Sequence, residues 1–187
     1  MTQPVTYFLT SARLGFRCWT PADLPLALAL WGNPQVTRLL GGPFSPEEVK
    51  QRLAREIAQC EASGLQYWPI FLRASGEHVG CAGLRPYRPS ERVHELGFHL
   101  LPAYWGQGLA EEAARAVIIC AFGTVGASGL FAGHHPENAA SRRVLQKLGF
   151  RYTHDELYPP TGLMHPSYFL AAPGSTGIPA CAPFLRS

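Results

Sequence analysis

Apolar and polar positions along this chain repeat with two periods, which predict strands and helices in a definite order. Alternation, or a short apolar run between turn residues, predicts seven strands, at 13–19, 66–73, 78–84, 92–101, 129–133, 150–157 and 167–171. A period near 3.6 predicts four helices, at 21–31, 46–63, 109–122 and 138–148. Short connections make the three-strand meander in the middle antiparallel, while the later strand–helix–strand units allow parallel or mixed pairing. The pattern therefore indicates an α/β fold.

Capping signals define the starts of the first two helices. Thr20 and Ser45 each precede a proline and stand three residues before a carboxylate, as in a capping box. Val49, Leu53 and Ile57 recur every four residues, so we expect an apolar face on the second helix.

Length and composition predict one globular domain over residues 1–172. The chain has 187 residues, 47% of them hydrophobic and 16% charged. Residues 173–187 show no periodicity, and we interpret them as a tail without function. The net charge of +3 is too small to indicate nucleic acid but suits a small anionic ligand.

Cysteine usage and the absence of targeting segments favour a cytoplasmic protein. The five cysteines are odd in number, widely spaced and without a CxxC pair, which is typical of reduced thiols. We recognise neither a signal peptide nor an apolar run long enough to cross a bilayer, so we expect no membrane partner.

A glycine-containing turn joins the strand that ends near Leu101 to the following helix. Glycine lets a backbone approach a ligand closely, and the first turn of a helix offers unpaired N–H groups and a positive dipole end. The pattern predicts an anion site formed by the backbone N–H groups of Gln107, Gly108, Leu109 and Ala110. An ordinary capped helix is the alternative interpretation.

Two segments resemble the GNAT superfamily of N-acetyltransferases. The sequence WGQGLA at 105–110 resembles the acyl-CoA signature Gln/Arg-x-x-Gly-x-Gly/Ala, with matches at Gly108 and Ala110 and a tryptophan at the first position. Residues 138–150 resemble the Asn-x-x-Ser…Leu-Gly-Phe segment of the subgroup that acetylates ribosomal-protein N-terminal alanine or serine. The resemblance covers about residues 12–171. It implies a GNAT-like, mostly antiparallel seven-stranded sheet with about four helices, and acetyl-CoA as co-substrate.

The resemblance also implies how the thioester would be held. In this family a bulge in the corresponding strand frees a backbone N–H for the thioester oxygen, and Gly97 is the expected irregularity. Phe98, His99 and Leu100 are then expected to line the acyl and pantetheine arm with backbone groups.

A base must take a proton from the acceptor amine, which is mostly protonated at neutral pH. Alternation places Glu95, Gly97 and His99 on one face of their strand, and we predict Glu95 as the base. His99 is the rival, with a better-placed intrinsic pKa, unless a bulge turns it away. A surface or substrate-binding acid is the alternative role for Glu95.

The leaving thiolate would need an acid. Many GNAT enzymes use a tyrosine seven residues after the motif asparagine, but Leu145 stands there in this chain. We predict Ser141 as the substitute, since it shares an inward stripe with Val144, Leu145 and Leu148. A hydrogen bond from Ser141 to a carbonyl one turn back is equally open. Asn138 is expected to cap the helix and to contact the pantetheine arm.

We expect no metal. The adjacent His134 and His135 would point to opposite faces of a strand, and no third ligand stands nearby.

The acceptor itself is not readable from the sequence. We expect residues 39–44, 86–90 and 158–166 to form its recognition loops, without a recognisable code. A protein or peptide N-terminal α-amine is favoured, and a small-molecule amine is the alternative. A non-catalytic CoA-binding or sensor module is a further alternative, supported by the missing tyrosine and opposed by the Glu95–Ser141 pair. Whether the chain works as a monomer or as a homodimer stays open.

Overall fold

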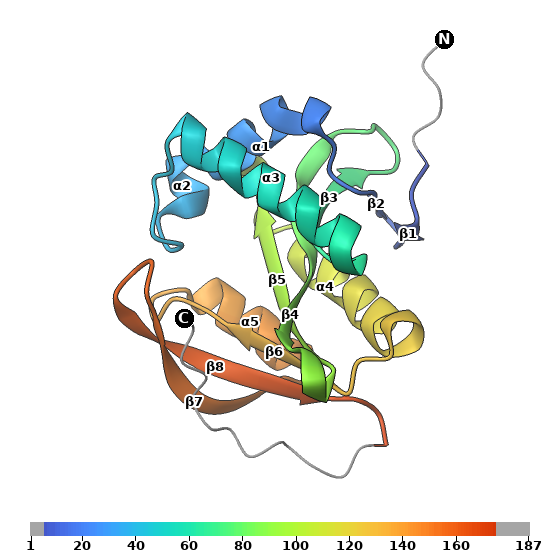
Figure 1. Ribbon diagram of the computed structural model, residues 1–187, viewed down its shortest axis with the longest axis vertical. Helices are drawn as coiled ribbons and strands as arrows, with labels where there is room; N and C mark the ends of the chain where they lie inside the picture. Colours follow the sequence, from blue (N-terminus) through green and yellow to red (C-terminus); the bar gives the residue numbers. More distant parts are fainter. Residues whose placement is uncertain (1–5, 175–187) are drawn as a thin grey trace.

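The computed structural model describes residues 6–174, which form one eight-stranded sheet with helices on both faces (Figure 1). The strand order is β1-β2-β3-β4-β5-β6-β8-β7. The strands are β1 (Leu9–Thr10), β2 (Leu14–Phe16), β3 (Tyr67–Leu72), β4 (His78–Arg88), β5 (Val93–Leu100), β6 (Gly129–Gly133), β7 (Arg151–Tyr158) and β8 (Leu163–Ala171). The α-helices are α1 (Leu24–Trp31), α2 (Pro34–Thr37), α3 (Pro46–Ser63), α4 (Leu109–Cys120) and α5 (Ala139–Lys147). All neighbouring strands pair antiparallel except β5 and β6, which are parallel.

The predicted mixed, mostly antiparallel sheet is confirmed, with one strand and one helix more than expected. The eighth strand, β1, has two residues, and the additional helix α2 has four, so neither is long enough to show a period in the sequence. Asn33 starts α2, because its side chain accepts a hydrogen bond of 2.9 Å from the Gln35 N–H. All but the first two residues of the predicted tail lie outside the described residues.

Both predicted capping boxes are present. The Ser45 backbone N–H donates to the Glu48 carboxylate at 2.7 Å, and the Glu48 N–H donates back to the Ser45 hydroxyl. The Thr20 N–H donates to Asp23 at 2.8 Å, and Arg17 binds the same carboxylate through two nitrogens at 2.7 Å each. These contacts fix where the helical segments begin that pack against β3 and β4.

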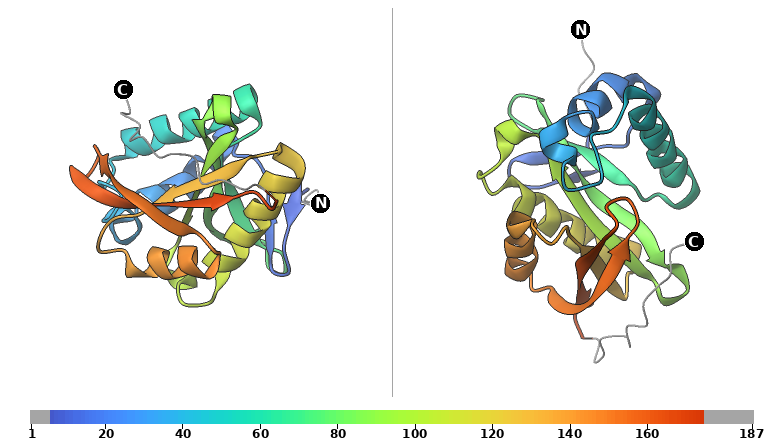
Figure 2. Two further views of the ribbon diagram at one scale, coloured as in Figure 1. Left: turned by 90° about the horizontal axis from the view of Figure 1, so that it is seen from below. Right: turned by 90° about the vertical axis from the view of Figure 1, so that its left-hand side faces the viewer.

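The two faces of the sheet pack against different helices (Figure 2). One core joins Trp68, Leu96 and Leu100 to α4 and α5. The second core joins Tyr67 and Cys81 to α1 and α3. Because side chains alternate along a strand, neighbouring residues such as Tyr67 and Trp68 belong to opposite cores.

Strands β5 and β6 pair over only three residues each and then diverge. Their register runs from Val93 opposite Gly129 to Glu95 opposite Phe131. Beyond that point β5 stays paired with β4 as far as Leu100, while β6 continues with β8. The sheet is therefore open between β5 and β6 from Glu95 onward.

Gly97 is not the site of a bulge, so that prediction was wrong. It pairs directly with Gly83, and the only irregularity between β4 and β5 in the described chain lies between Pro86 and Arg88. A Cβ at Gly97 would overlap the ring of Tyr67. Glycine stands here because the Tyr67 ring fills the space that a side chain would need.

No helix in the described ranges is long and apolar enough to cross a membrane.

We expect Gly97→Ala to lower the free energy of unfolding by about 1–3 kcal/mol, because the tightly packed Tyr67 ring must move. Gly123→Ala is the matched control, since a Cβ at Gly123 meets nothing within 4 Å. Denaturant unfolding of both variants checks this. Equal free energies of unfolding for the two variants would show that the Tyr67 ring can move without loss of stability.

Candidate active site

A cavity of about 800 Å³ opens where β5 and β6 diverge. Its lining includes β5, the turn before α4, the start of α4, α5, and residues of β7 and β8. Nine of the residues predicted for the site line this cavity: Glu95, Phe98, His99, Leu100, Gly108, Leu109, Ala110, Asn138 and Ser141. Gln107, the remaining one, does not line it; its carbonyl accepts a hydrogen bond from Arg13 and its side chain donates to Ala103.

The first turn of α4 is arranged as an anion site. Gly106 and Gly108 both have positive φ, at 73° and 76°, a conformation that favours glycine. Gly108 is the N-cap, so no capping side chain covers the N–H groups of Leu109 and Ala110. These groups and the positive end of the helix dipole border the cavity.

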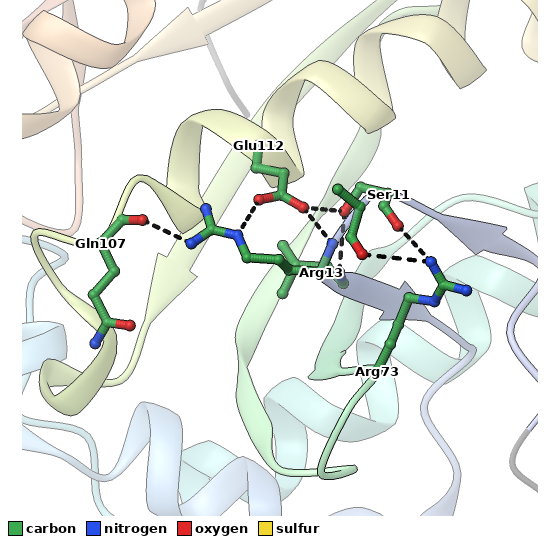
Figure 3. Close-up of polar contacts among 7 residues, drawn as sticks. Ser11, Arg13, Arg73, Gln107 and Glu112 are labelled. Carbon is green, nitrogen blue, oxygen red and sulfur yellow. Dashed lines mark hydrogen bonds and ion pairs between the residues drawn. The ribbon is translucent and has the colours of Figure 1, made fainter.

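Acidic side chains in this first turn are neutralised by cations, which keeps the turn suitable for an anion. Glu112 accepts hydrogen bonds from the Ser11 hydroxyl at 2.7 Å and from Nε of Arg13 at 2.6 Å (Figure 3). Although burial opposes it, these hydrogen bonds lower the pKa of Glu112. Glu111 pairs with Arg115 at 2.8 Å and with Lys147 at 3.3 Å.

Arg13 was not recognised as a site residue from the sequence, yet it lies beside the glycine turn. Its guanidinium donates to the Gln107 carbonyl at 3.1 Å (Figure 3). A Cβ at Gly108 would be 3.7 Å from the other terminal nitrogen of Arg13. The β1–β2 turn thus brings the cation that neutralises Glu112 to the α4 N-terminus from about 95 residues away in the sequence.

Trp105 fixes the turn to the end of β5. Its indole N–H donates to the Leu100 carbonyl at 2.8 Å, while half of the residue stays exposed. The side chain therefore holds the backbone of the turn in position, and the Leu100 carbonyl points away from β4.

Hydrogen-bond alternation also orients the N–H of Phe98. The Leu101 N–H donates to Val79 on the β4 side, and the unbroken register alternates bonded and non-bonded pairs along β5. Phe98 faces Ala82 in a non-bonded pair, so its N–H points to the side where β6 has already diverged. A free N–H toward the cavity thus results from the divergence of the strands and needs no bulge.

Asn138 and Ser141 begin α5 at the opposite wall. The Asn138 side chain accepts a hydrogen bond of 3.0 Å from the Ser141 N–H, which confirms its capping role. Ser141 is half-buried on the predicted stripe with Val144 and Leu145, and it lines the cavity. Within residues 6–174 its hydroxyl makes no hydrogen bond, so the alternative bond to a carbonyl one turn back is not formed.

Glu95 stands at the point of divergence. It is opposite Phe131 in the last β5–β6 pair and opposite Arg85 on β4. Burial opposes the charged form of the Arg85 guanidinium, but Tyr67, Glu56 and Glu95 together raise the pKa of Arg85.

His99 lies on the same face as Glu95, as the alternation predicted, but its ring is already engaged. The Trp31 indole N–H donates to Nδ1 of His99 at 3.3 Å. Burial, and then Arg52 and Arg85, lower the pKa of His99 well below its usual value. A neutral imidazole whose acceptor nitrogen is occupied is a poor base, which leaves Glu95 as the better candidate.

A group of charged residues under the cavity was missed in the sequence. Glu56 of α3 is buried, forms an ion pair with Arg85 and accepts the Tyr67 N–H at 2.9 Å. The Arg85 guanidinium lies 4.1 Å from the centre of the Tyr67 ring. Arg52 of α3 lines the cavity beside them. Burial, followed by the Glu95 carboxylate, raises the pKa of the Tyr67 phenol, so the phenol stays protonated.

The signal for this group was present in the helical period. Positions 52 and 56 follow Val49 by three and seven residues, so charged side chains occupy the stripe that faces the sheet. Ile57, which we expected on that stripe, is only partly buried, and Glu56 takes the buried place.

Two of the three predicted recognition loops form the mouth of the cavity. Leu39 and Leu40 line it from one side, and Tyr158 and His165 from the other. The two loops are in close contact, since a Cβ at Gly41 would be 2.6 Å from the Pro160 carbonyl. Residues 86–90 do not line the cavity.

No group of three His, Cys, Asp or Glu residues within 6–174 is arranged to hold a metal ion.

Known proteins match most of this chain. The sequence profile of the family described as "Acetyltransferase (GNAT) domain" matches residues 13–151. The "Uncharacterized N-acetyltransferase YoaA" of Bacillus subtilis is 29% identical over 147 residues, which cover 76% of this chain and 82% of that protein. The "FsC-acetyl coenzyme A-N(2)-transacetylase" of Aspergillus fumigatus is 32% identical over 148 residues, 70% of this chain and 61% of that protein.

A solved structure shares the fold. RimL, a ribosomal L7/L12 alpha-N-protein acetyltransferase in complex with coenzyme A, superimposes with a TM-score of 0.75. The match covers 88% of this chain and 97% of RimL at 18% sequence identity.

The neutral state of His99 predicts a pH dependence of stability. In the unfolded chain this histidine takes up a proton near pH 6.5, whereas in the folded protein it does so only at lower pH. The free energy of unfolding should therefore fall as the pH drops below 6.5, by about 1 kcal/mol per pH unit from this residue. His99→Gln, which keeps an acceptor for Trp31, should show a shallower loss in denaturant unfolding at pH 7, 6 and 5. If the free energy of unfolding falls equally steeply with decreasing pH in the wild type and in His99→Gln, a neutral His99 is contradicted.

Proposed function

Because this chain belongs to the GNAT family of N-acetyltransferases, whose domain profile covers residues 13–151, we propose that it transfers an acetyl group from acetyl-CoA to a primary α-amine. The observation that carries this proposal is that one cavity has both Glu95, at the divergence of β5 and β6, and the α4 N-terminus on its border. One wall thus offers a base and another offers anion-binding N–H groups.

The residues present fit a pyrophosphate and a thioester arm. The N–H groups of Leu109 and Ala110 are not covered by a capping side chain, and Arg13 neutralises the Glu112 carboxylate of the same turn. The backbone of Phe98, His99 and Leu100 lines the cavity along the open edge of β5, where an extended arm can be held by backbone groups. Asn138 and Ser141 face this edge from α5. Acetyl-CoA would supply the activated acetyl group.

We assign each catalytic task to a residue of this chain. Glu95 accepts the proton of the acceptor ammonium, directly or through a water molecule, so that the free amine attacks the thioester carbon. The Phe98 N–H donates to the carbonyl oxygen as negative charge develops there. The Ser141 hydroxyl donates a hydrogen bond to the departing sulfur.

An α-amine suits this base better than a lysine side chain. The pKa of an α-amino group is about 8, against about 10.4 for lysine, so a carboxylate removes its proton with a smaller free-energy cost. Among the matched proteins, the name of RimL gives a protein alpha-N group as the acetylated position, and the name of the Aspergillus fumigatus protein gives an N(2) position.

We expect Glu95→Gln to lower kcat about 10²- to 10⁴-fold, because the amine then lacks its base. The assay follows free thiol released from acetyl-CoA with a panel of peptides and small amines, and calorimetry follows CoA affinity, which should not change. Glu91→Gln is the control, since Glu91 is exposed and does not line the cavity. Tight CoA binding by the wild type without turnover on any amine, unaffected by Glu95→Gln, would instead favour a non-catalytic CoA-binding module.

We expect Gly108→Val to weaken CoA binding at least tenfold, because valine cannot adopt a φ of 76° without moving the N–H groups of the α4 turn. Gly126→Val is the matched control: Gly126 has a φ of 70° and equally open surroundings, but it lies outside the cavity.

Trp105→Ala should reduce stability more than CoA affinity, since Trp105 acts on the turn through the Leu100 carbonyl. Calorimetric titration distinguishes these cases; loss of binding in Trp105→Ala but not in Gly108→Val would reverse the assignment.

A further inference from the structure

We propose that Arg52 binds a carboxylate of the acceptor, so that the acceptor carries an α-amine and a carboxylate on one molecule. This inference rests on the proposed function, because it concerns the acceptor end of the same cavity. The observation behind it is a cavity-lining guanidinium held between aromatic rings that forms no ion pair within residues 6–174.

Aromatic packing fixes the Arg52 guanidinium in place. Its central carbon lies 4.6 Å from the centre of the Trp31 ring and 5.9 Å from that of Phe44. Such stacking orients the flat guanidinium and limits its hydration. Its Nε is buried and has no hydrogen-bond partner in the described chain.

The neighbouring carboxylate is already used. Glu56, one turn further along α3, pairs with Arg85 and accepts the Tyr67 N–H. Arg85 also brings a second positive charge close to Arg52, and burial together with Arg85 lowers the pKa of Arg52. An arginine stays charged under these conditions, and a charged group that is largely removed from water is stabilised by an anionic partner. A ligand carboxylate in the cavity would supply that partner through two parallel hydrogen bonds.

Arg52 and the proposed base belong to the same end of the cavity. Arg52 stacks on Trp31, and Trp31 donates to His99, which shares a strand face with Glu95. Arg52, Tyr67 and Glu95 all line this cavity. The acceptor end therefore offers a cation for a carboxylate and a carboxylate for an ammonium.

This charge arrangement should discriminate between amines. A purely cationic amine, such as a polyamine, would place a second positive charge near Arg52 and Arg85, which is unfavourable. An amino acid, or a peptide with an acidic side chain close to its N-terminus, matches both charges. Both acceptors carry an α-amine and a carboxylate on one molecule, and the experiment below distinguishes between them.

The test compares acceptors that differ only in the carboxylate. Free amino acids are assayed against their carboxamides, peptides beginning Ser-Glu against Ser-Gln, and a polyamine is included. We expect the wild type to have a kcat/KM at least tenfold higher for the acidic member of one of these pairs. A preference in the first pair identifies a free amino acid, and a preference in the second identifies an acidic peptide. Equal use of acid and amide, or preference for the polyamine, would overturn the inference while leaving acetyl transfer intact.

Substitution of Arg52 tests the residue itself. Arg52→Met should raise KM for the preferred acidic acceptor about 10- to 100-fold, and should leave kcat/KM for the matching amide and the Kd for CoA unchanged. Arg52→Lys keeps the charge but not the forked geometry, so its KM for the acidic acceptor should lie between those of the wild type and Arg52→Met. An equal loss on acid and amide would indicate a merely structural role for Arg52.

A binding measurement keeps the inference testable without turnover. The N-acetylated amino acid or peptide retains the carboxylate and lacks the amine, and we expect it to raise the Tm of the wild type but not that of Arg52→Met. If no amine is acetylated but this shift persists, the proposed function fails and the carboxylate site stands. If amines are acetylated and no carboxylate raises the Tm, the carboxylate site fails alone.

Discussion

The site depends on one feature of the backbone, the end of pairing between β5 and β6 at Glu95 and Phe131. Two parallel strands that diverge leave their facing N–H and C=O groups without ladder partners, and such groups need other partners or a ligand. The cavity occupies this opening. Glu95 stands where the opening begins, and the Phe98 N–H points into it, so the proposed base and the proposed oxyanion donor come from the same strand.

Strand alternation then divides the cavity between two kinds of chemistry. One face of β5 belongs to the core with α4 and α5, whose N-terminal turns bring backbone N–H groups and the Ser141 hydroxyl. The other face belongs to the core with α1 and α3, which brings Arg52 to the cavity and Glu56 to the Tyr67 N–H. The proposed cofactor end is thus built mainly from backbone groups, and the proposed acceptor end from charged and aromatic side chains. This division is consistent with a common donor and an acceptor that varies between relatives.

Much of the fold was predictable because its signals are local. Periodicity identified the seven longer strands and four longer helices. The capping box at Thr20 marked the start of the 3₁₀ turn Pro21–Asp23 that leads into α1, and the one at Ser45 marked the start of α3. The elements that were missed, β1 and α2, have two and four residues and are held by neighbouring parts of the fold. The prediction of a bulge at Gly97 was wrong for a related reason. A glycine is needed there because the Tyr67 ring, about 30 residues away in the sequence, fills the space of a side chain.

The sequence by itself determined the order of elements, the glycine turn before α4, the Asn138 cap and the alternation that puts Glu95 and His99 on one face. Each of these features depends on residues that are close together in the sequence. Only the tertiary structure decided that Trp31 occupies the acceptor nitrogen of His99 and that Arg13 borders the α4 turn. It also decided that Arg52 lines the cavity without an ion-pair partner among residues 6–174. Those facts arise from contacts between distant segments, and no local pattern specifies which distant side chain will share a buried space.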